Sequence, residues 1–123
     1  MRILVADDEA DMRDTTKMLL EMDGHHVELA NNGKQAVELA TRLMPDVVFM
    51  DMKMPEMDGL TATRLLRSGA TTKEVPIICI SAYLHQGDWR EKALEAGCND
   101  CLSKPVDLGR LALILSRVPL RNG

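Results

Sequence analysis

The chain has 123 residues, the size of one domain with a single core, and 15 basic against 19 acidic residues give a formal net charge of −4. Aromatic residues make up only 2%, so without a basic excess or stacking rings we expect no contact with nucleic acid. No apolar run approaches the length of a membrane span, and the N-terminus lacks a signal-peptide layout, so we expect a cytoplasmic location and no membrane contact.

The acidic surplus lies in residues 7–14. This segment holds five acids and one Arg, and the rest of the chain holds 14 basic and 14 acidic residues. Acidic side chains are favourable near the positive end of a helix dipole. On that ground we assign three of the five acids to a helix start and its exposed surface: Glu9, Asp11 and Asp14.

Short apolar runs alternate with segments of helical spacing. Five runs predict strands, the last of them weak, at residues 3–6, 27–29, 47–50, 77–80 and 101–102. Apolar residues recur at helical spacing in 36–43 and 108–115. The pattern predicts five strands alternating with five helices.

Residues typical of helix caps and helix ends agree with this assignment of strands and helices. Asn32 with Gln35 is typical of a helix cap, and Gly24 and Gly97 of helix ends. The strands are apolar throughout, as in a parallel sheet covered on both faces. We therefore predict an α/β fold, an open (βα)₅ sheet. The last helix is expected to run out near Val118 before Pro119, so that the domain spans 1–119 and 120–123 form a tail.

The cysteines and the last helix allow further interpretations. An odd number of cysteines argues against a disulfide framework, and Cys98-x-x-Cys101 lacks the two further ligands of a zinc site, so we expect reduced, structural thiols. Leu113 and Ile114 lie off the predicted core stripe, which is formed by Leu108, Leu111, Ala112 and Leu115. They form either an exposed apolar patch for a partner or a second copy, or a helix edge under a loop.

Charged and polar residues follow four of the predicted strands. In open α/β sheets, ligands bind outside the carboxyl ends of the strands. Those ends carry Asp7-Asp8, Asp51, Ser81 and Lys104. If the strand order is 2-1-3-4-5, the first and third strands are neighbours and their carboxylates converge.

Converging carboxylates are costly unless a cation lies among them. Two carboxylates about 4 Å apart repel by roughly 1 kcal/mol in water and about 4 kcal/mol at an effective dielectric of 20. A hard divalent ion with oxygen ligands fits this set, and Mg²⁺ fits better than Ca²⁺. Asp51 is the natural nucleophile for a phosphoryl group, with Lys104 as a charge for a phosphoryl oxygen and Ser81 as a hydrogen-bond donor.

Four segments in register carry a family resemblance over essentially the whole chain: ILVADDEADMR, PDVVFMDMKMPEMDG, PIICISA and AGCNDCLSKPVD. The chain resembles the receiver (CheY-like) domain of two-component response regulators. The resemblance implies a flavodoxin-like doubly wound parallel sheet of order 2-1-3-4-5, which is the order known for the chemotaxis member of the family.

The resemblance also implies roles for site residues. Asp51 would accept the phosphoryl group as an aspartyl phosphate, Ser81 would be the switch hydroxyl and Lys104 would pair with the phosphate. Mg²⁺ would be held by Asp7, Asp8, Asp51 and the backbone carbonyl of Lys53. A cis peptide bond would precede Pro105.

One position departs from the family pattern. Three residues before the lysine, many receivers carry an aromatic side chain that turns inward on phosphorylation, and here that residue is Cys101. A switch that couples a hydroxyl to an aromatic ring is therefore in question. Tyr83, two residues after Ser81, is an alternative cover for the site.

The implied function is a phosphorelay signalling module. It would take a phosphoryl group from a sensor histidine kinase or histidine phosphotransfer protein and change conformation to control a partner or output domain. It would not be an enzyme, beyond assisting its own phosphorylation and dephosphorylation. One alternative is a pseudo-receiver that binds partners without phosphorylation. The other is a haloacid-dehalogenase-type Mg²⁺ phosphotransferase, disfavoured because Lys53 occupies the place of that family's second acid.

Overall fold

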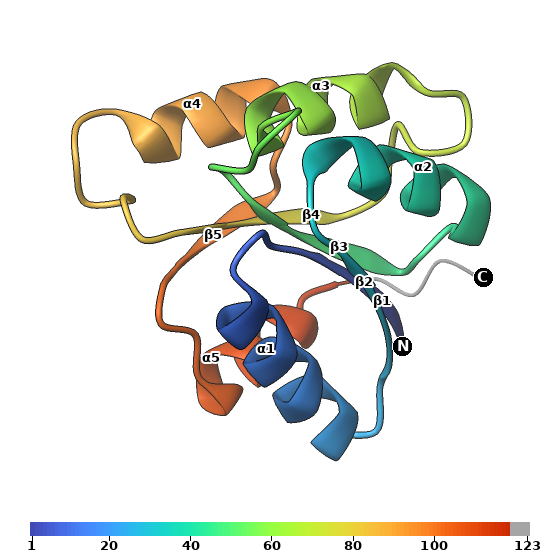
Figure 1. Ribbon diagram of the computed structural model, residues 1–123, viewed down its shortest axis with the longest axis vertical. Coiled ribbons are helices and arrows are strands. Elements are labelled where there is room, and N and C mark those ends of the chain that lie inside the picture. The colour runs from blue at the N-terminus through green and yellow to red at the C-terminus, as the bar shows by residue number, and fades with distance from the viewer. Residues whose placement is uncertain (119–123) are drawn as a thin grey trace.

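The computed structural model describes residues 1–118 and confirms the alternation of strands and helices (Figure 1). None of the helices in this part of the chain is long and apolar enough to cross a membrane. In chain order the elements are β1 (Arg2–Ala6), α1 (Ala10–Met22), β2 (His26–Ala30), α2 (Gly33–Leu43), β3 (Val47–Asp51), α3 (Gly59–Ser68), β4 (Ile77–Ser81), α4 (Trp89–Ala96), β5 (Asp100–Ser103) and α5 (Leu108–Leu115).

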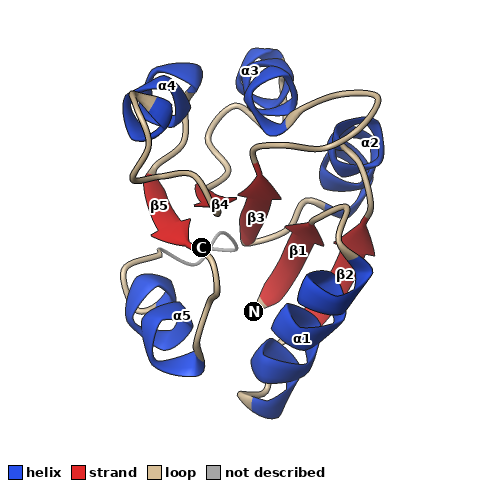
Figure 2. Ribbon diagram, turned by 60° about the vertical axis from the view of Figure 1, so that its left-hand side comes forward, coloured by secondary structure: helices blue, strands red, loops and turns tan. Residues whose placement is uncertain are grey.

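The five strands form one parallel sheet in the order β2-β1-β3-β4-β5. Helices α1 and α5 cover one face of the sheet, and α2, α3 and α4 cover the other (Figure 2). The predicted α/β fold, a flavodoxin-like doubly wound sheet, is therefore correct. The chain crosses over β1 on its way from β2 to β3, so β1 lies between these two strands and pairs with β3. The carboxyl ends of β1 and β3 therefore lie at the same edge of the sheet.

Two apolar cores follow from the covered faces. Every residue of β3 and β4 is buried, because a central parallel strand contacts helices on both sides. Met50 and Cys79 face the core under α2, α3 and α4, whereas Phe49 and Ile78 face the core under α1 and α5. Successive residues of each continuous apolar run therefore point alternately into the two cores.

Two of the predicted caps are present, one at a helix start and one at a helix end. The Asn32 side chain accepts a hydrogen bond from the Gln35 N–H at 2.8 Å, and the Gln35 side chain accepts one from the Asn31 N–H at 2.9 Å. Helix α4 ends at Ala96, and Gly97 follows with φ of 122°, a conformation that favours glycine.

The last helix differs from its prediction at its C-terminus. Helix α5 ends at Leu115 and not near Val118, because Arg117 and Val118 donate to the carbonyls of Ile114 and Leu115, three residues back. Such bonds tighten the last turn and end the regular helix. The expected stop at Pro119 and the boundary with the tail 120–123 lie outside the described residues.

The predicted core stripe of the last helix was also wrong in part. Ile114 is buried with 6% of its surface exposed, together with Leu111 and Leu115, whereas Ala112 is exposed. Leu113 is 56% exposed. The helix is rotated relative to the predicted stripe because the larger Ile114 fills the core that Ala112 would leave open.

Arg67 joins three segments on the α3 and α4 side of the sheet. From α3, its guanidinium donates to the carbonyl oxygens of Gly97 at 2.9 Å and Val75 at 2.7 Å, and to the side-chain oxygen of Asn99 at 2.9 Å. The Asn99 oxygen also accepts from the Ile77 N–H at 2.8 Å. Arg67 thus satisfies acceptors in the loops before β4 and before β5.

Replacing Arg67 tests this role. In Arg67→Met the apolar stem stays but the loop acceptors lose a charged donor, so we expect the free energy of unfolding to fall by about 2–4 kcal/mol. Urea denaturation measures the change. The matched control is Arg64→Met on the exposed face of the same helix, for which we expect less than about 0.5 kcal/mol. Equal effects of the two substitutions would contradict the role given to Arg67.

Candidate functional site

The carboxyl ends of four strands bring one polar residue each to the same edge of the sheet. Asp51 ends β3, Ser81 ends β4, and Asp7 and Lys104 directly follow β1 and β5. The parallel register sets their heights: Ala6 pairs with Met50, and Ser81 pairs with Ser103. Since Asp51 pairs with Ile80, the ends of neighbouring strands lie within one residue of each other along the sheet edge.

The ammonium of Lys104 lies between three carboxylates. Its Nζ is 3.0 Å from Asp51 Oδ2, 3.1 Å from Asp7 Oδ2 and 2.9 Å from Glu9 Oε1. The Lys104 side chain is only 8% exposed, and those of Asp7 and Asp51 are 2% and 6% exposed. One buried positive charge therefore offsets two buried negative charges and one exposed one.

The two buried carboxylates are held in the same way. Asp7 Oδ1 accepts from the backbone N–H of Glu9 at 2.9 Å, and Asp51 Oδ1 accepts from that of Lys53 at 3.2 Å. In each case the second oxygen contacts Lys104. Both side chains are thereby oriented by the backbone two residues further on, a local turn that Asp readily forms at the end of a strand.

Glycine at position 59 permits the loop after β3 to fold back. A Cβ at Gly59 would lie 2.1 Å from the backbone oxygen of Asp51, so any other residue would displace the end of β3. The Gly59 N–H donates to the carbonyl of Met52 at 3.0 Å. The start of α3 is thus held against the strand end that carries Asp51.

Burial changes the proton affinity of the site. Removal of Asp51 from water raises its pKa to about 7, and the nearby Asp7 adds to this rise, while Lys104 and the Lys53 N–H oppose it. Burial alone would lower the pKa of Lys104, but its bonds to Glu9, Asp51 and Asp7 outweigh burial and raise it. Lys104 therefore stays charged, and the Asp51 carboxyl is the group whose ionisation is costly.

Four acids could hold a cation at this edge. One carboxylate oxygen from each lies within 4.8 Å of the others, the acids being Asp7, Asp8, Glu9 and Asp51. Asp8 is exposed. A cavity of about 250 Å³ opens beside them, lined by Asp8, Glu9, Asp51, Lys53, Ala82, Tyr83 and Lys104.

Glu9 belongs to the site, which the sequence did not predict. It was assigned to the helix start, and it does precede α1, but its side chain makes no capping hydrogen bond. Its carboxylate instead reaches Lys104, which lies 95 positions further along the chain. The position of Glu9 directly after Asp8 is the one sequence feature that indicates a place at the acidic site. The same position is also compatible with a side chain that turns toward the helix.

Ser81 and Tyr83 occupy different positions at the site. Ser81 is buried, its hydroxyl oxygen accepts from the Tyr83 N–H at 2.9 Å, and it does not line the cavity. Tyr83 does line the cavity, with the Lys53 ammonium 4.2 Å from its ring centre and 5.4 Å from that of Trp89. The Lys53 side chain and the Tyr83 ring therefore border one side of the cavity, and Trp89 contacts Lys53 from outside the cavity lining.

Two further predicted positions lie beside the site. The Lys104–Pro105 peptide bond is cis. Cys101 is buried in the core under α3 and α4, and it lines a different pocket, between α4 and α5. The thiol is therefore not among the groups that border the acidic cavity.

Comparison with known proteins identifies the family. Residues 3–116 match the model of the response regulator receiver domain. The chain belongs to this family. Receiver domains are signalling domains of two-component systems, so the resemblance drawn from the sequence is confirmed.

Curated relatives of this receiver domain include regulators and kinases. It is 40% identical over 116 residues to regulatory protein AtoC of Escherichia coli (strain K12), covering 94% of this chain and 24% of AtoC. It is 37% identical over 123 residues to the histidine-protein kinase BarA of the same strain, covering all of this chain and 13% of BarA. The chain thus spans about a quarter or less of the length of these relatives.

A solved structure shares both fold and extent. The receiver domain of sensor histidine kinase PA1611 from Pseudomonas aeruginosa PAO1 superposes with a TM-score of 0.89 at 38% identity, and the match covers 95% of each chain. That crystal structure has a magnesium ion coordinated in its active site cleft.

The raised pKa of Asp51 predicts a pH dependence of stability. A carboxyl with a pKa of 3.8 in the unfolded chain and about 7 in the fold binds its proton more tightly in the fold. Its contribution to the free energy of unfolding therefore falls as the pH rises from 3.8 to about 7. We therefore compare the free energy of unfolding of Asp51→Asn with that of the wild type in the absence of metal. We expect the difference, variant minus wild type, to be larger at pH 8 than at pH 4 by roughly 2–4 kcal/mol.

Urea denaturation of both proteins in a metal chelator measures this difference. Comparing the two proteins at each pH cancels the other titrating groups, because the substitution is isosteric. A difference in stability that stays constant from pH 4 to pH 8 would contradict the account of a buried, costly Asp51 carboxylate.

Proposed function

We propose that this receiver domain accepts a phosphoryl group from a phosphohistidine onto Asp51 and changes conformation as a result. The observation that carries the proposal is the Lys104 ammonium held against Asp51 and Asp7 at 3.0 and 3.1 Å. A buried cation beside a carboxylate stabilises the charge that develops on a transferring phosphoryl group.

The transfer can be written with the residues of the site. An oxygen of Asp51 attacks phosphorus, the P–N bond of the phosphohistidine breaks, and the imidazole leaves with the bonding electrons and takes up a proton. Lys104 then pairs with a phosphoryl oxygen in place of the Asp51 carboxylate. The Lys53 N–H, now 3.2 Å from Asp51 Oδ1, offers a second donor at the site.

Ser81 would act after the transfer as the switch hydroxyl. Because its oxygen accepts from the Tyr83 N–H, its own proton is available for donation to a phosphoryl oxygen. Drawing this hydroxyl toward Asp51 would pull on the segment after β4, since Tyr83 is attached to it. Cys101, at the usual aromatic position, offers no ring to follow this movement, so the change is proposed to pass through the loop after β4.

Mg²⁺ fits the ligands at this edge. Carboxylate and carbonyl oxygens are what this hard cation prefers, and Asp7, Asp8, Asp51 and the Lys53 carbonyl would hold it. When bound, the ion would neutralise acid charge and bind a phosphoryl oxygen. The magnesium ion in the related PA1611 receiver structure supports this assignment.

The partners follow from the same chemistry. The donor would be a sensor histidine kinase or a histidine phosphotransfer protein in the cytoplasm, and the domain would span 1–119 with 120–123 as a tail. An output partner or a second copy would use the exposed part of α5 that includes Leu113, which is 56% exposed. Catalysis by the domain would be limited to its own phosphorylation and dephosphorylation.

Labelling with a small acyl phosphate tests the acceptor. With acetyl phosphate and Mg²⁺, we expect intact mass spectrometry to show one added phosphoryl group on the wild type and none on Asp51→Asn. The matched control is Asp58→Asn, an exposed acid in the loop after β3 that caps α3. This variant should be labelled as the wild type is, because Asn also caps helices.

Three outcomes of that experiment would reject the proposal. Labelling that survives Asp51→Asn would place the acceptor elsewhere. No labelling of a folded wild type that also fails to bind Mg²⁺ would favour a pseudo-receiver. Steady release of product from an external phosphoester would favour a phosphotransferase of the haloacid-dehalogenase type.

Removing one exposed acid tests the metal assignment. We expect Asp8→Asn to weaken Mg²⁺ binding by at least about tenfold, because it removes a charged ligand of the ion. Titration calorimetry measures the affinity. Asp11→Asn, in the exposed first turn of α1, is the control and should bind as the wild type does. Equal losses in the two variants would show a diffuse charge effect and not a defined ligand.

A further inference from the structure

Two buried cysteines lie side by side on β4 and β5. In the parallel pairing of these strands, Cys79 and Cys101 are direct register partners. Adjacent strands are about 4.8 Å apart, a separation within the Cα–Cα range that a disulfide spans. Both side chains belong to the core under α2, α3 and α4, and each thiol shifts the pKa of the other.

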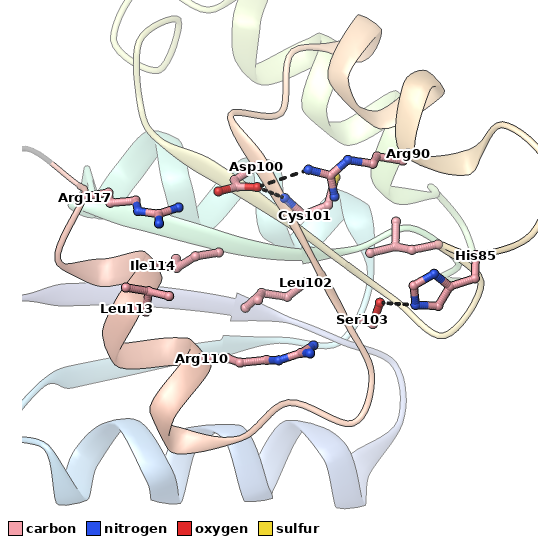
Figure 3. Close-up of a pocket in the computed structure, with 11 residues that line it drawn as sticks. His85, Arg90, Asp100, Cys101, Leu102, Ser103, Arg110, Leu113, Ile114 and Arg117 are labelled. Atoms are coloured by element: carbon pink, nitrogen blue, oxygen red, sulfur yellow. Dashed lines mark hydrogen bonds and ion pairs between the residues drawn. The ribbon is translucent and has the colours of Figure 1, made fainter.

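Only one of the two cysteine residues is exposed at all. Cys101 is 7% exposed and lines a pocket of about 320 Å³ between α4 and α5, whereas Cys79 behind it is fully buried. Figure 3 shows Cys101 next to Arg90 at one side of this pocket, with Arg110 on α5 and Arg117 just after α5 across from it. A small oxidant that enters the pocket therefore meets Cys101 first.

The surroundings favour the thiolate at the outer position. Contact with the Cys79 thiol lowers the pKa of Cys101 and the positive charge of Arg90 adds to this effect, while burial and the nearby Asp100 oppose it. The same thiol contact, together with burial, raises the pKa of Cys79. Because the thiolate is the form that reacts with oxidants, Cys101 is suited to react first and Cys79 to follow.

We propose that Cys101 and Cys79 are a peroxide-reactive thiol pair that closes to a disulfide between β4 and β5. In the first step the Cys101 sulfur attacks a peroxide oxygen; the O–O bond breaks, the second oxygen leaves as water or an alcohol, and Cys101 becomes a sulfenic acid. In the second step the Cys79 sulfur attacks the Cys101 sulfur; the S–O bond breaks, and the hydroxyl leaves with the Cys79 proton as water. The two thiols supply the two electrons that reduce the peroxide.

Cys98 provides an internal control within the same core. It is also buried, but its thiol contacts Thr63 Oγ1 at 3.8 Å, and it does not line the pocket between α4 and α5. Burial raises its pKa to about 11. The third cysteine should therefore stay reduced while the pair reacts.

The pair also lies close to the acidic site along both strands. Cys79 is two residues before Ser81, and Cys101 is three before Lys104. A disulfide would tie together the strands that lead to these residues. Any effect on phosphoryl acceptance rests on the proposed function, whereas the thiol chemistry does not, so the test reads the thiols alone.

The test uses the full chain, hydrogen peroxide and mass spectrometry. After peroxide treatment, unfolding and alkylation, we expect one alkylated cysteine in place of three. Peptide mapping should join the Cys79 and Cys101 segments and find the alkyl group on Cys98. A reductant should restore all three alkylation sites. Three alkylated cysteines after treatment, or a bridge that includes Cys98, would overturn the proposal.

Variants assign the order of the two steps. Cys98→Ser is the matched control and should still form the bridge. In Cys79→Ser the bridge cannot form, and dimedone should trap a sulfenic acid at Cys101, whereas Cys101→Ser should lose the peroxide reaction at Cys79. Trapping at Cys79 in place of Cys101 would reverse the assignment. Peptide mapping of the wild type decides the existence of the bridge even if a variant does not fold.

Discussion

The ammonium of Lys104 is the constraint on which the acidic edge of the sheet depends. It lies within 3.1 Å of two buried carboxylates and one exposed carboxylate, and in residues 1–118 it is the one cation that forms ion pairs with the carboxylates of Asp7 and Asp51. Removing one partner of such a buried pair costs about 3–5 kcal/mol, because a charge is left unpaired away from water. The edge is therefore built around charge that is only partly compensated, which is the condition in which a divalent cation and a phosphoryl group are both favourable.

The rest of the fold places this ammonium and its partners. Parallel pairing brings the carboxyl ends of β1, β3, β4 and β5 to one edge of the sheet, and backbone N–H groups two residues after Asp7 and Asp51 orient the two carboxylates. Gly59 allows the start of α3 to approach the end of β3. Between β4 and β5, the register that aligns Ser81 with Ser103 also aligns Cys79 with Cys101, two residues earlier on each strand. One register thus brings together both the acidic site and the thiol pair.

The sequence predicted those features that depend on position along the chain. Asp51 and Lys104 could be placed because each comes at the end of an apolar strand, and strand ends of a parallel sheet share an edge. Features that depend on the direction of a side chain could not be placed: Glu9 turns to Lys104 and not to its own helix, and Ile114 replaces Ala112 in the core. The five acceptors of Arg67 were also unpredictable, because four of them are backbone carbonyls, which every residue carries and which leave no mark in the sequence.

The most direct test of the central claim is a crystal structure of the chain with Mg²⁺ and beryllofluoride, which mimics a phosphoryl group on a carboxylate. The account predicts beryllium bonded to an oxygen of Asp51, Lys104 paired with a fluorine, and Mg²⁺ contacting the Asp8 side of the cavity. An ion pair between Lys104 and Asp51 that stays intact, with beryllofluoride or the metal bound elsewhere, would contradict it.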